Sequence, residues 1–201
     1  MSLYLTEFIL PPEAERDARI AAIDETAGRA GGELIELQAG ADSGRLYAIV
    51  EHGDRAALET AFRESSLSPI EVVEVRLVGP TLKELRVARG NAGYLVEWDI
   101  ADDHTMESYL EHKKSNAPLH ALVPETTFLR TYVREDLVKC LSFYRAPDED
   151  AVLRTREAVN TPVSRIGRVI EAPRPVAATV PVKDSAPTTV LGSLQVSSLQ
   201  A

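Results

Sequence analysis

The stretch YLTEF at residues 4–8 returns as YLVEW at residues 94–98, with the same order of apolar and acidic side chains. Two more pairs of segments match in the same order along the chain: Asp54 with residues 57–58 and Asp148 with residues 151–152, then SPI at residues 68–70 and TPV at residues 161–163. Self-similarity at a nearly constant spacing is the signature of a repeated structural unit. The sequence therefore predicts an internal duplication.

Each copy shows the same succession of patterns, which predicts strand, helix, strand, strand, helix and strand. In the first copy, residues 3–10 are rich in β-branched and aromatic residues and end at a proline pair, as expected of a strand. Apolar residues at helical spacing follow, and Asp54 can cap a second helix. We expect an α+β fold made of tandem ferredoxin-like βαββαβ repeats, packed sheet against sheet as a pseudo-dimer that resembles a dimeric α+β barrel.

The predicted domain organisation follows from the repeat and from a change in composition near the end of the chain. Prolines interspersed with Ala, Thr, Val and Ser after residue 171 show no periodicity and indicate a flexible, disordered tail. The expected segments are repeat 1 at residues 1–79, a connection at 80–92, repeat 2 at 93–171, a Pro-rich linker at 172–188 and a terminal peptide at 189–201.

Composition narrows the classes of partner. The chain carries 31 acidic and 22 basic side chains, a net charge of −9, which makes a nucleic-acid backbone an unfavourable partner. No apolar stretch reaches the ~20 residues that a membrane-spanning helix needs, and the N-terminus lacks the pattern of a secretory signal. With Cys140 as the single cysteine, a disulfide framework is excluded. We therefore expect a soluble, cytoplasmic protein, with a homo-oligomer left open.

The candidate metal ligands are three histidines and the single cysteine, because imidazole and thiolate bind nickel, copper and zinc. His104 and His112 are eight residues apart, which on one helix would separate them by ~12 Å and prevent them from sharing an ion. Both are expected on the polar face of that helix, and His120 lies beyond its expected end. Solvated histidines and a buried thiol at Cys140 are the alternative interpretation, and a metal site would need ligands from the other repeat or another chain.

A second candidate site is a polar patch between the two sheets. Glu7 and Glu97 each interrupt an apolar strand at the same position of the two repeats. Alternation of side chains places Arg130 and Tyr132 on one face of a later strand, so we expect a Glu97–Arg130 pair with tyrosine hydroxyls, including that of Tyr144, nearby. Two interpretations remain: an ion pair that fixes how the repeats dock, or a ligand or metal pocket between the sheets.

The second repeat resembles a family of small ferredoxin-like proteins described as nickel-binding or nickel-responsive. The resemblance lies in residues 94–97 (YLVE), 130–133 (RTYV), 139–140 (KC), 144–152 (YRAPDEDAV) and 163–169. It implies the fold, a sheet-packed dimer and nickel as a candidate metal. It implies no reaction, and the metal ligands of the family do not map onto positions of this chain.

The end of the chain, LGSLQVSSL at residues 191–199, resembles the cargo-loading peptides of encapsulin nanocompartments. Such peptides are short, C-terminal and tethered by flexible linkers. The expected docking residues are large apolar side chains separated by small ones: Leu191, Leu194, Val196 and Leu199. Burial of each aliphatic anchor contributes roughly 1.5–3 kcal/mol, so one tail is expected to bind an encapsulin shell protein modestly.

Three functions fit these features. The first is a metal-binding protein for nickel or a similar divalent ion, carried as cargo inside an encapsulin compartment in the cytoplasm, without a clear catalytic activity. The second is a haem- or oxygen-dependent enzyme on a tandem ferredoxin-like barrel, an expectation from fold analogy. The third is a small-ligand binding module, which a pocket without imidazole at the sheet interface would favour.

Overall fold

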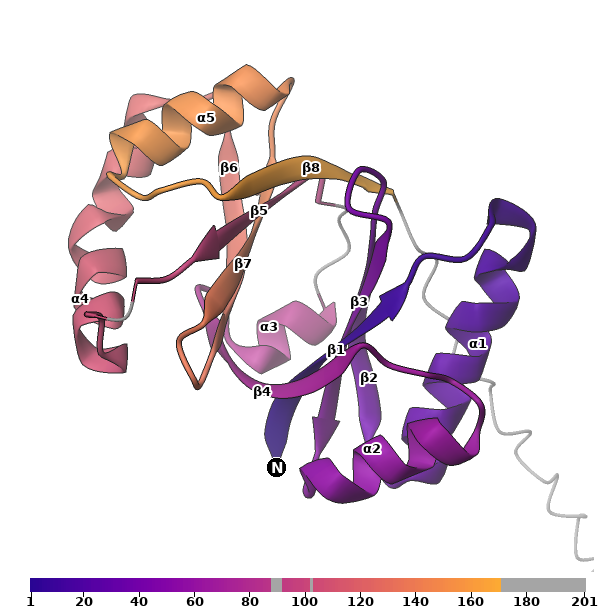
Figure 1. Cartoon of the computed structure of the whole chain (residues 1–201). Helices are drawn as coiled ribbons and strands as arrows, with labels where there is room; N and C mark the ends of the chain where they lie inside the picture. The colour runs from indigo at the N-terminus through magenta and orange to yellow at the C-terminus, as the bar shows by residue number, and fades with distance from the viewer. Residues whose placement is uncertain (88–91, 102, 171–201) are drawn as a thin grey trace, which may run out of the picture.

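The computed structural model describes residues 1–87, 92–101 and 103–170 (Figure 1). The expected Pro-rich linker and the docking residues Leu191, Leu194, Val196 and Leu199 lie outside the described residues. The elements of the first half are β1 (Ser2–Ile9), α1 (Glu13–Arg29), β2 (Glu33–Gly40), β3 (Arg45–His52), α2 (Arg55–Glu64) and β4 (Glu71–Val78). After α3 (Leu82–Val87) come β5 (Tyr94–Asp99), α4 (Met106–Asn116), the 3₁₀ helix η1 (Ala117–Leu122), β6 (Thr127–Arg134), β7 (Lys139–Arg145), α5 (Glu149–Ala158) and β8 (Arg165–Ile170).

The eight strands form one closed antiparallel barrel in the order β1-β3-β2-β8-β5-β7-β6-β4. Within that order the first half reads β4-β1-β3-β2 and the second half β8-β5-β7-β6, so both halves share one strand order. The expected α+β class and the expected likeness to a dimeric α+β barrel are confirmed. The expected stacking of two sheets is replaced by edge-to-edge closure, because pairing of edge strands satisfies backbone groups that stacked sheets would leave open.

Two seams between the halves close the barrel, and they differ in extent. At one seam β4 pairs with β6 from Val75–Arg134 to Val78–Thr131. At the other seam, the described part of β8 pairs with β2 through Ala39–Ile170 and Gly40–Val169. The β2–β8 seam is therefore the shorter one, and it lies beside the turn between β2 and β3.

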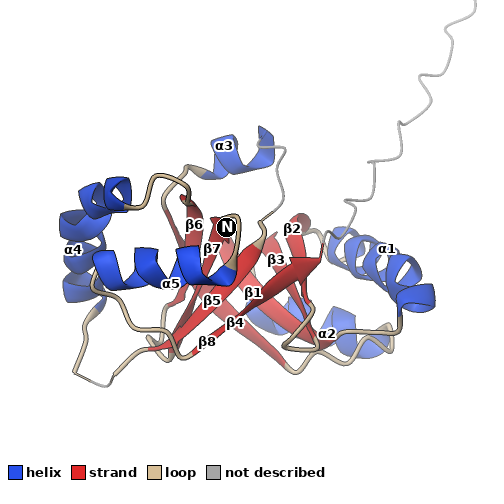
Figure 2. Cartoon of the chain, turned by 90° about the horizontal axis from the view of Figure 1, so that it is seen from above, coloured by secondary structure: helices blue, strands red, loops and turns tan. Residues whose placement is uncertain are grey.

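Helices cover the outside of the barrel, with α1 and α2 over the first half and α4 and α5 over the second half (Figure 2). Local sequence explains where they begin. The Asp54 carboxylate accepts hydrogen bonds from the backbone N–H groups of Ala56 and Ala57 at the start of α2, as predicted, and Asp148 does the same for Ala151 in α5. Thr105 and Ser108 form a reciprocal capping box that fixes the start of α4 after residue 105.

Side-chain alternation separates two environments. Leu5, Leu95 and Phe143 point into the barrel with a cluster of other apolar side chains. Phe8 and Trp98, from the outer face of their strands, pack beneath the helices. No helix of the described residues combines the length and apolar character needed to cross a bilayer.

Candidate functional site

A buried ion pair crosses the interior of the barrel from β2 to β6. Arg130 donates through Nε to Glu36 Oε2 at 2.7 Å and through a second nitrogen to Glu36 Oε1, and the Tyr132 hydroxyl donates to Glu36 Oε2 at 2.6 Å. Glu36 and Arg130 are 4% and 5% exposed. The guanidinium also stacks on the Phe143 ring, 4.7 Å from its centroid. The Glu36 carboxylate, from the first half of the chain, is thus bound by Arg130 and Tyr132 of the second half.

The expected Glu97–Arg130 pair does not form. Glu97 accepts a hydrogen bond from the Tyr47 hydroxyl at 3.2 Å and pairs with Arg165 at 3.2 Å, while Arg130 is bound to Glu36. The reason is a β-bulge at Leu34/Glu36, which interrupts alternation and turns Glu36 into the barrel toward Arg130. Sequence alternation alone places Glu36 on the same face as Leu34, so it carried no signal for this residue.

Glu7 lies in the barrel interior near Glu97, and its carboxylate is bound by Lys139 of β7. The Lys139 ammonium donates to Glu7 and lies 3.3 Å from Glu71 and 3.8 Å from Glu97. Burial opposes the charge on Lys139, but the hydrogen bond to Glu7 and the nearby carboxylates raise its pKa above the ordinary value. Lys139 therefore stays charged, and the three carboxylates surround an ammonium group rather than an open cation site.

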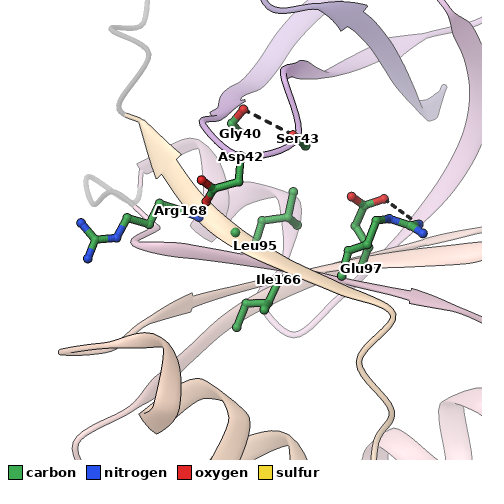
Figure 3. A pocket seen from close by; sticks show the side chains of 9 residues that line it. Gly40, Asp42, Ser43, Leu95, Glu97, Ile166 and Arg168 are labelled. Atoms are coloured by element: carbon green, nitrogen blue, oxygen red, sulfur yellow. Dashed lines mark hydrogen bonds and ion pairs between the residues drawn. The ribbon is translucent and has the colours of Figure 1, made fainter.

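A pocket of about 140 Å³ opens beside the shorter seam (Figure 3). Leu95 and Ile166 line it with apolar side chains, while Asp42 and Ser43 enter from the β2–β3 turn and Glu97 from the barrel interior. The backbone N–H of Arg168 donates to Asp42 Oδ2 at 2.8 Å, which ties the turn to β8. No imidazole lines this pocket, and its volume is below the roughly 300–1,000 Å³ of pockets for drug-sized ligands.

Two of the predicted histidines lie against one indole ring on the outer face of the second half. The ring centroids of His104 and His112 are 5.6 Å and 6.4 Å from that of Trp98. The prediction of a shared helix was wrong, because α4 begins at Met106 and His104 lies in the loop before the capping residue Thr105. The prediction that His112 lies on a solvated face was also wrong, because His112 is half-buried and its Nε2 lies 3.3 Å from Thr161 Oγ1.

His120, Cys140 and Tyr144 lie in the same helix–sheet layer but apart from the pocket. His120 stacks on Phe128 with 5.1 Å between ring centroids, and the Cys140 thiol is fully buried beneath α4. Tyr144 lies on the outer face of β7 and accepts a hydrogen bond from Arg156, so it does not join Glu97 and Arg130 in the barrel interior. Among the described residues, no group of three or more His, Cys, Asp or Glu side chains is placed to hold a metal ion.

Sequence reasoning missed four residues that the structure brings into these sites: Glu36, Tyr47, Trp98 and Lys139. Tyr47 and Lys139 alternate into the barrel, so a register for each strand would have placed them. The contact of Trp98 with His104 depends on the path of the loop before α4, which the sequence pattern does not give.

Comparisons with known proteins agree with the fold, and one family model matches part of the chain. Residues 94–169 match the family described as nickel responsive protein SCO4226-like. A solved structure of a candidate chlorite dismutase is similar with a TM-score of 0.51 at 14% identity, covering 85% of this chain and 96% of that chain. A candidate monooxygenase from Lactobacillus acidophilus has a TM-score of 0.46 at 11% identity, covering 85% and 94%. No curated protein matches the chain in sequence. The similarity to the first structure shows that the two proteins share a fold, and it carries no information about the activity of this chain.

The cross-barrel ion pair makes a prediction about stability. Replacing Arg130 with Met leaves the Glu36 carboxylate buried without its partner, so we expect a loss of about 3–5 kcal/mol in the free energy of unfolding. The double variant Glu36→Leu with Arg130→Met removes both charges and is expected to recover most of that loss. Urea denaturation of the single and double variants measures this coupling.

The matched control is Arg76→Met, which breaks an exposed pair with Glu135 at 3.0 Å. A surface pair of this kind contributes about 0–1 kcal/mol. An Arg130→Met variant no less stable than Arg76→Met would contradict a structural role for the buried pair.

Proposed function

We propose that this protein binds nickel or a similar divalent ion reversibly, through His104 and His112 on the Trp98 face of the second half. The observation that carries the proposal is the approach of two imidazoles to one indole ring, despite their separation in sequence. Both lie within residues 94–169, the segment that matches the nickel responsive family.

The chemistry of the two rings suits a borderline metal. His104 Nδ1 is held by the Asp103 carboxylate at 2.9 Å, which leaves the outer nitrogen of this partly exposed ring directed away from that bond. Burial, followed by the charge of Lys113, lowers the pKa of His112, so its imidazole is neutral at physiological pH. Neutral imidazole is the form that binds nickel, and an orienting carboxylate on the other nitrogen is typical of metal-bound histidine.

The geometry supports a weak, open site rather than a closed one. The described residues bring two imidazoles to this face and no third ligand of the usual kinds. Water or a second copy of the chain would supply the other coordination positions. Such a site favours exchange of the ion over permanent retention.

Trp98 is the single tryptophan of the chain and provides a direct readout. Titration with nickel chloride should quench its fluorescence saturably, with a dissociation constant below about 1 mM, equivalent to about −4 kcal/mol. His104→Gln and His112→Gln should each weaken binding at least about tenfold, because even orienting partners of metal ligands contribute that much.

Two controls define the site. His120→Gln removes an imidazole that stacks on Phe128, and Glu97→Gln removes one of the two carboxylates that line the pocket, so neither should change nickel affinity. Quenching that rises linearly without saturation, or that persists in the double histidine variant, would remove the proposal. Loss of binding in Glu97→Gln alone would instead place the ligand in the pocket and favour a small-ligand module.

The residues do not fit haem as well as they fit a metal ion. The pocket at the shorter seam, of about 140 Å³, is far smaller than a haem, and no histidine lines it. Two larger surface hollows, of about 430 Å³ and 340 Å³, also have no histidine in their lining. One face of the His120 ring is stacked against Phe128, and the ring centroid lies 6.2 Å from that of Tyr144. We therefore derive no haem-dependent step.

We also propose that residues 189–201 load the protein into an encapsulin shell. The support is the pattern of leucines, valine and small residues at 191–199, after a Pro-rich segment long enough to act as a tether. Many tails in one shell raise capture through multivalency, although each binds modestly.

Deletion of residues 189–201 tests whether this segment is the loading signal. The truncated protein should keep its thermal midpoint and lose co-purification with a co-expressed encapsulin shell, and Leu194→Asp with Leu199→Asp should behave the same way. Gln195→Asp adds a charge at a polar position and serves as the matched control, with loading retained. If the truncated chain still loads to the same extent, the loading signal does not lie in residues 189–201.

A further inference from the structure

Two buried cations without carboxylate partners lie between the helices and the sheet of the second half. The Lys113 ammonium lies 3.5 Å from Thr131 Oγ1 and over the rings of Tyr109 and Phe128, at 5.8 Å and 5.7 Å from their centroids. Arg156 is 1% exposed. Neither side chain forms an ion pair with any carboxylate of the described residues.

The groups that do contact Arg156 leave part of its guanidinium without a partner. It donates to the Tyr144 hydroxyl at 3.3 Å and to the Pro162 carbonyl at 2.5 Å, while its Nε has no acceptor. A buried charge is stable when it is paired or hydrogen-bonded, so two such cations in one layer are an unusual combination.

Unpartnered polar atoms gather in the same layer. Six buried side-chain nitrogen or oxygen atoms of the described chain lack a hydrogen-bond partner, and four of them belong to this part of the molecule: Tyr109 Oη, His120 Nδ1, Thr126 Oγ1 and Arg156 Nε. The aromatic contacts of Phe128 with His120 and Tyr144, at 5.1 Å and 5.6 Å between centroids, join these residues into one cluster. Buried polar groups are almost always satisfied, so the concentration of exceptions points to a polar occupant.

We propose that this layer binds a small anion, held by Lys113 and Arg156 with the Tyr109 hydroxyl and the His120 imidazole as further hydrogen-bonding groups. The sign of the ligand follows from two positive side chains with no carboxylate among their contacts. Because η1 contacts both α4 and α5 over the sheet, we take the occupant to be an anion of a few atoms, such as formate or chloride. Lys113 as a whole residue is half-buried, so this side of the layer lies near the surface.

The first half shows that the fold does not require such a cluster. The corresponding layer beneath α1 and α2 is filled mainly by apolar side chains, among them Phe8, Ile23, Leu58 and Phe62, although Thr6 Oγ1 and Arg16 Nε of this half also lack hydrogen-bond partners. What distinguishes the second half is therefore a fully buried guanidinium, that of Arg156.

Thermal unfolding of the full chain at constant ionic strength tests the proposal, with EDTA present to exclude metal effects. Sodium formate is compared with sodium gluconate, whose anion is too large for the layer. Wild-type protein should unfold several degrees higher in formate than in gluconate, because a ligand that binds the folded state stabilises it by mass action. The difference should persist in Lys113→Arg and in Lys114→Met, the exposed neighbour on α4. It should vanish in Lys113→Met.

A direct measurement does not depend on stability. Saturation-transfer difference NMR should show transfer from protein protons to the formate proton in wild-type protein and in Lys114→Met, but not in Lys113→Met. Equal stabilisation by formate and gluconate in the wild type would overturn the proposal. A formate effect that is the same in Lys113→Met would overturn it as well.

Discussion

Polar contacts that cross the barrel interior hold the two halves of this protein in one structure. Glu36 of β2 binds Arg130 of β6, Glu7 of β1 binds Lys139 of β7, and Tyr47 of β3 binds Glu97 of β5. Each contact joins a strand of the first half to a strand of the second half. Because these groups are buried, separating the halves would expose apolar surface and also leave charged side chains without their partners. The barrel therefore acts as a joint core rather than as two docked units.

This arrangement determines which parts of the molecule have room for a ligand or an ion. Side chains occupy the barrel interior, and a small pocket opens at the seam between β2 and β8. The outer layers differ more. The layer beneath α1 and α2 is mainly apolar and contains one buried imidazole, that of His52, whereas the layer beneath α4 and α5 contains several imidazoles, a buried guanidinium and an ammonium. The second half carries the candidate binding chemistry, and the first half completes the core that positions it.

Sequence patterns predicted the succession of strands and helices because alternation and capping are local properties. Asp54 caps α2 as expected, and Asp148 occupies the same position in α5. The residue pairs that bind across the barrel were harder to predict from the sequence, because bulges at Leu34/Glu36 and Phe128/Arg130 change which side chains enter the barrel. A bulge leaves little trace in one sequence. His104 was misplaced for a similar reason: its position depends on the loop that precedes Thr105, and helical spacing does not apply there.

Native-state hydrogen exchange tests the joint core most directly, because it reports the opening free energy of individual backbone amides. The slowest amides of β1 in the first half and of β5 and β7 in the second half should share one opening free energy and fall equally with urea. A second half that opens at a clearly lower free energy while β1 stays protected would contradict the account. The cross-barrel contacts would then be incidental to the stability of two independent units.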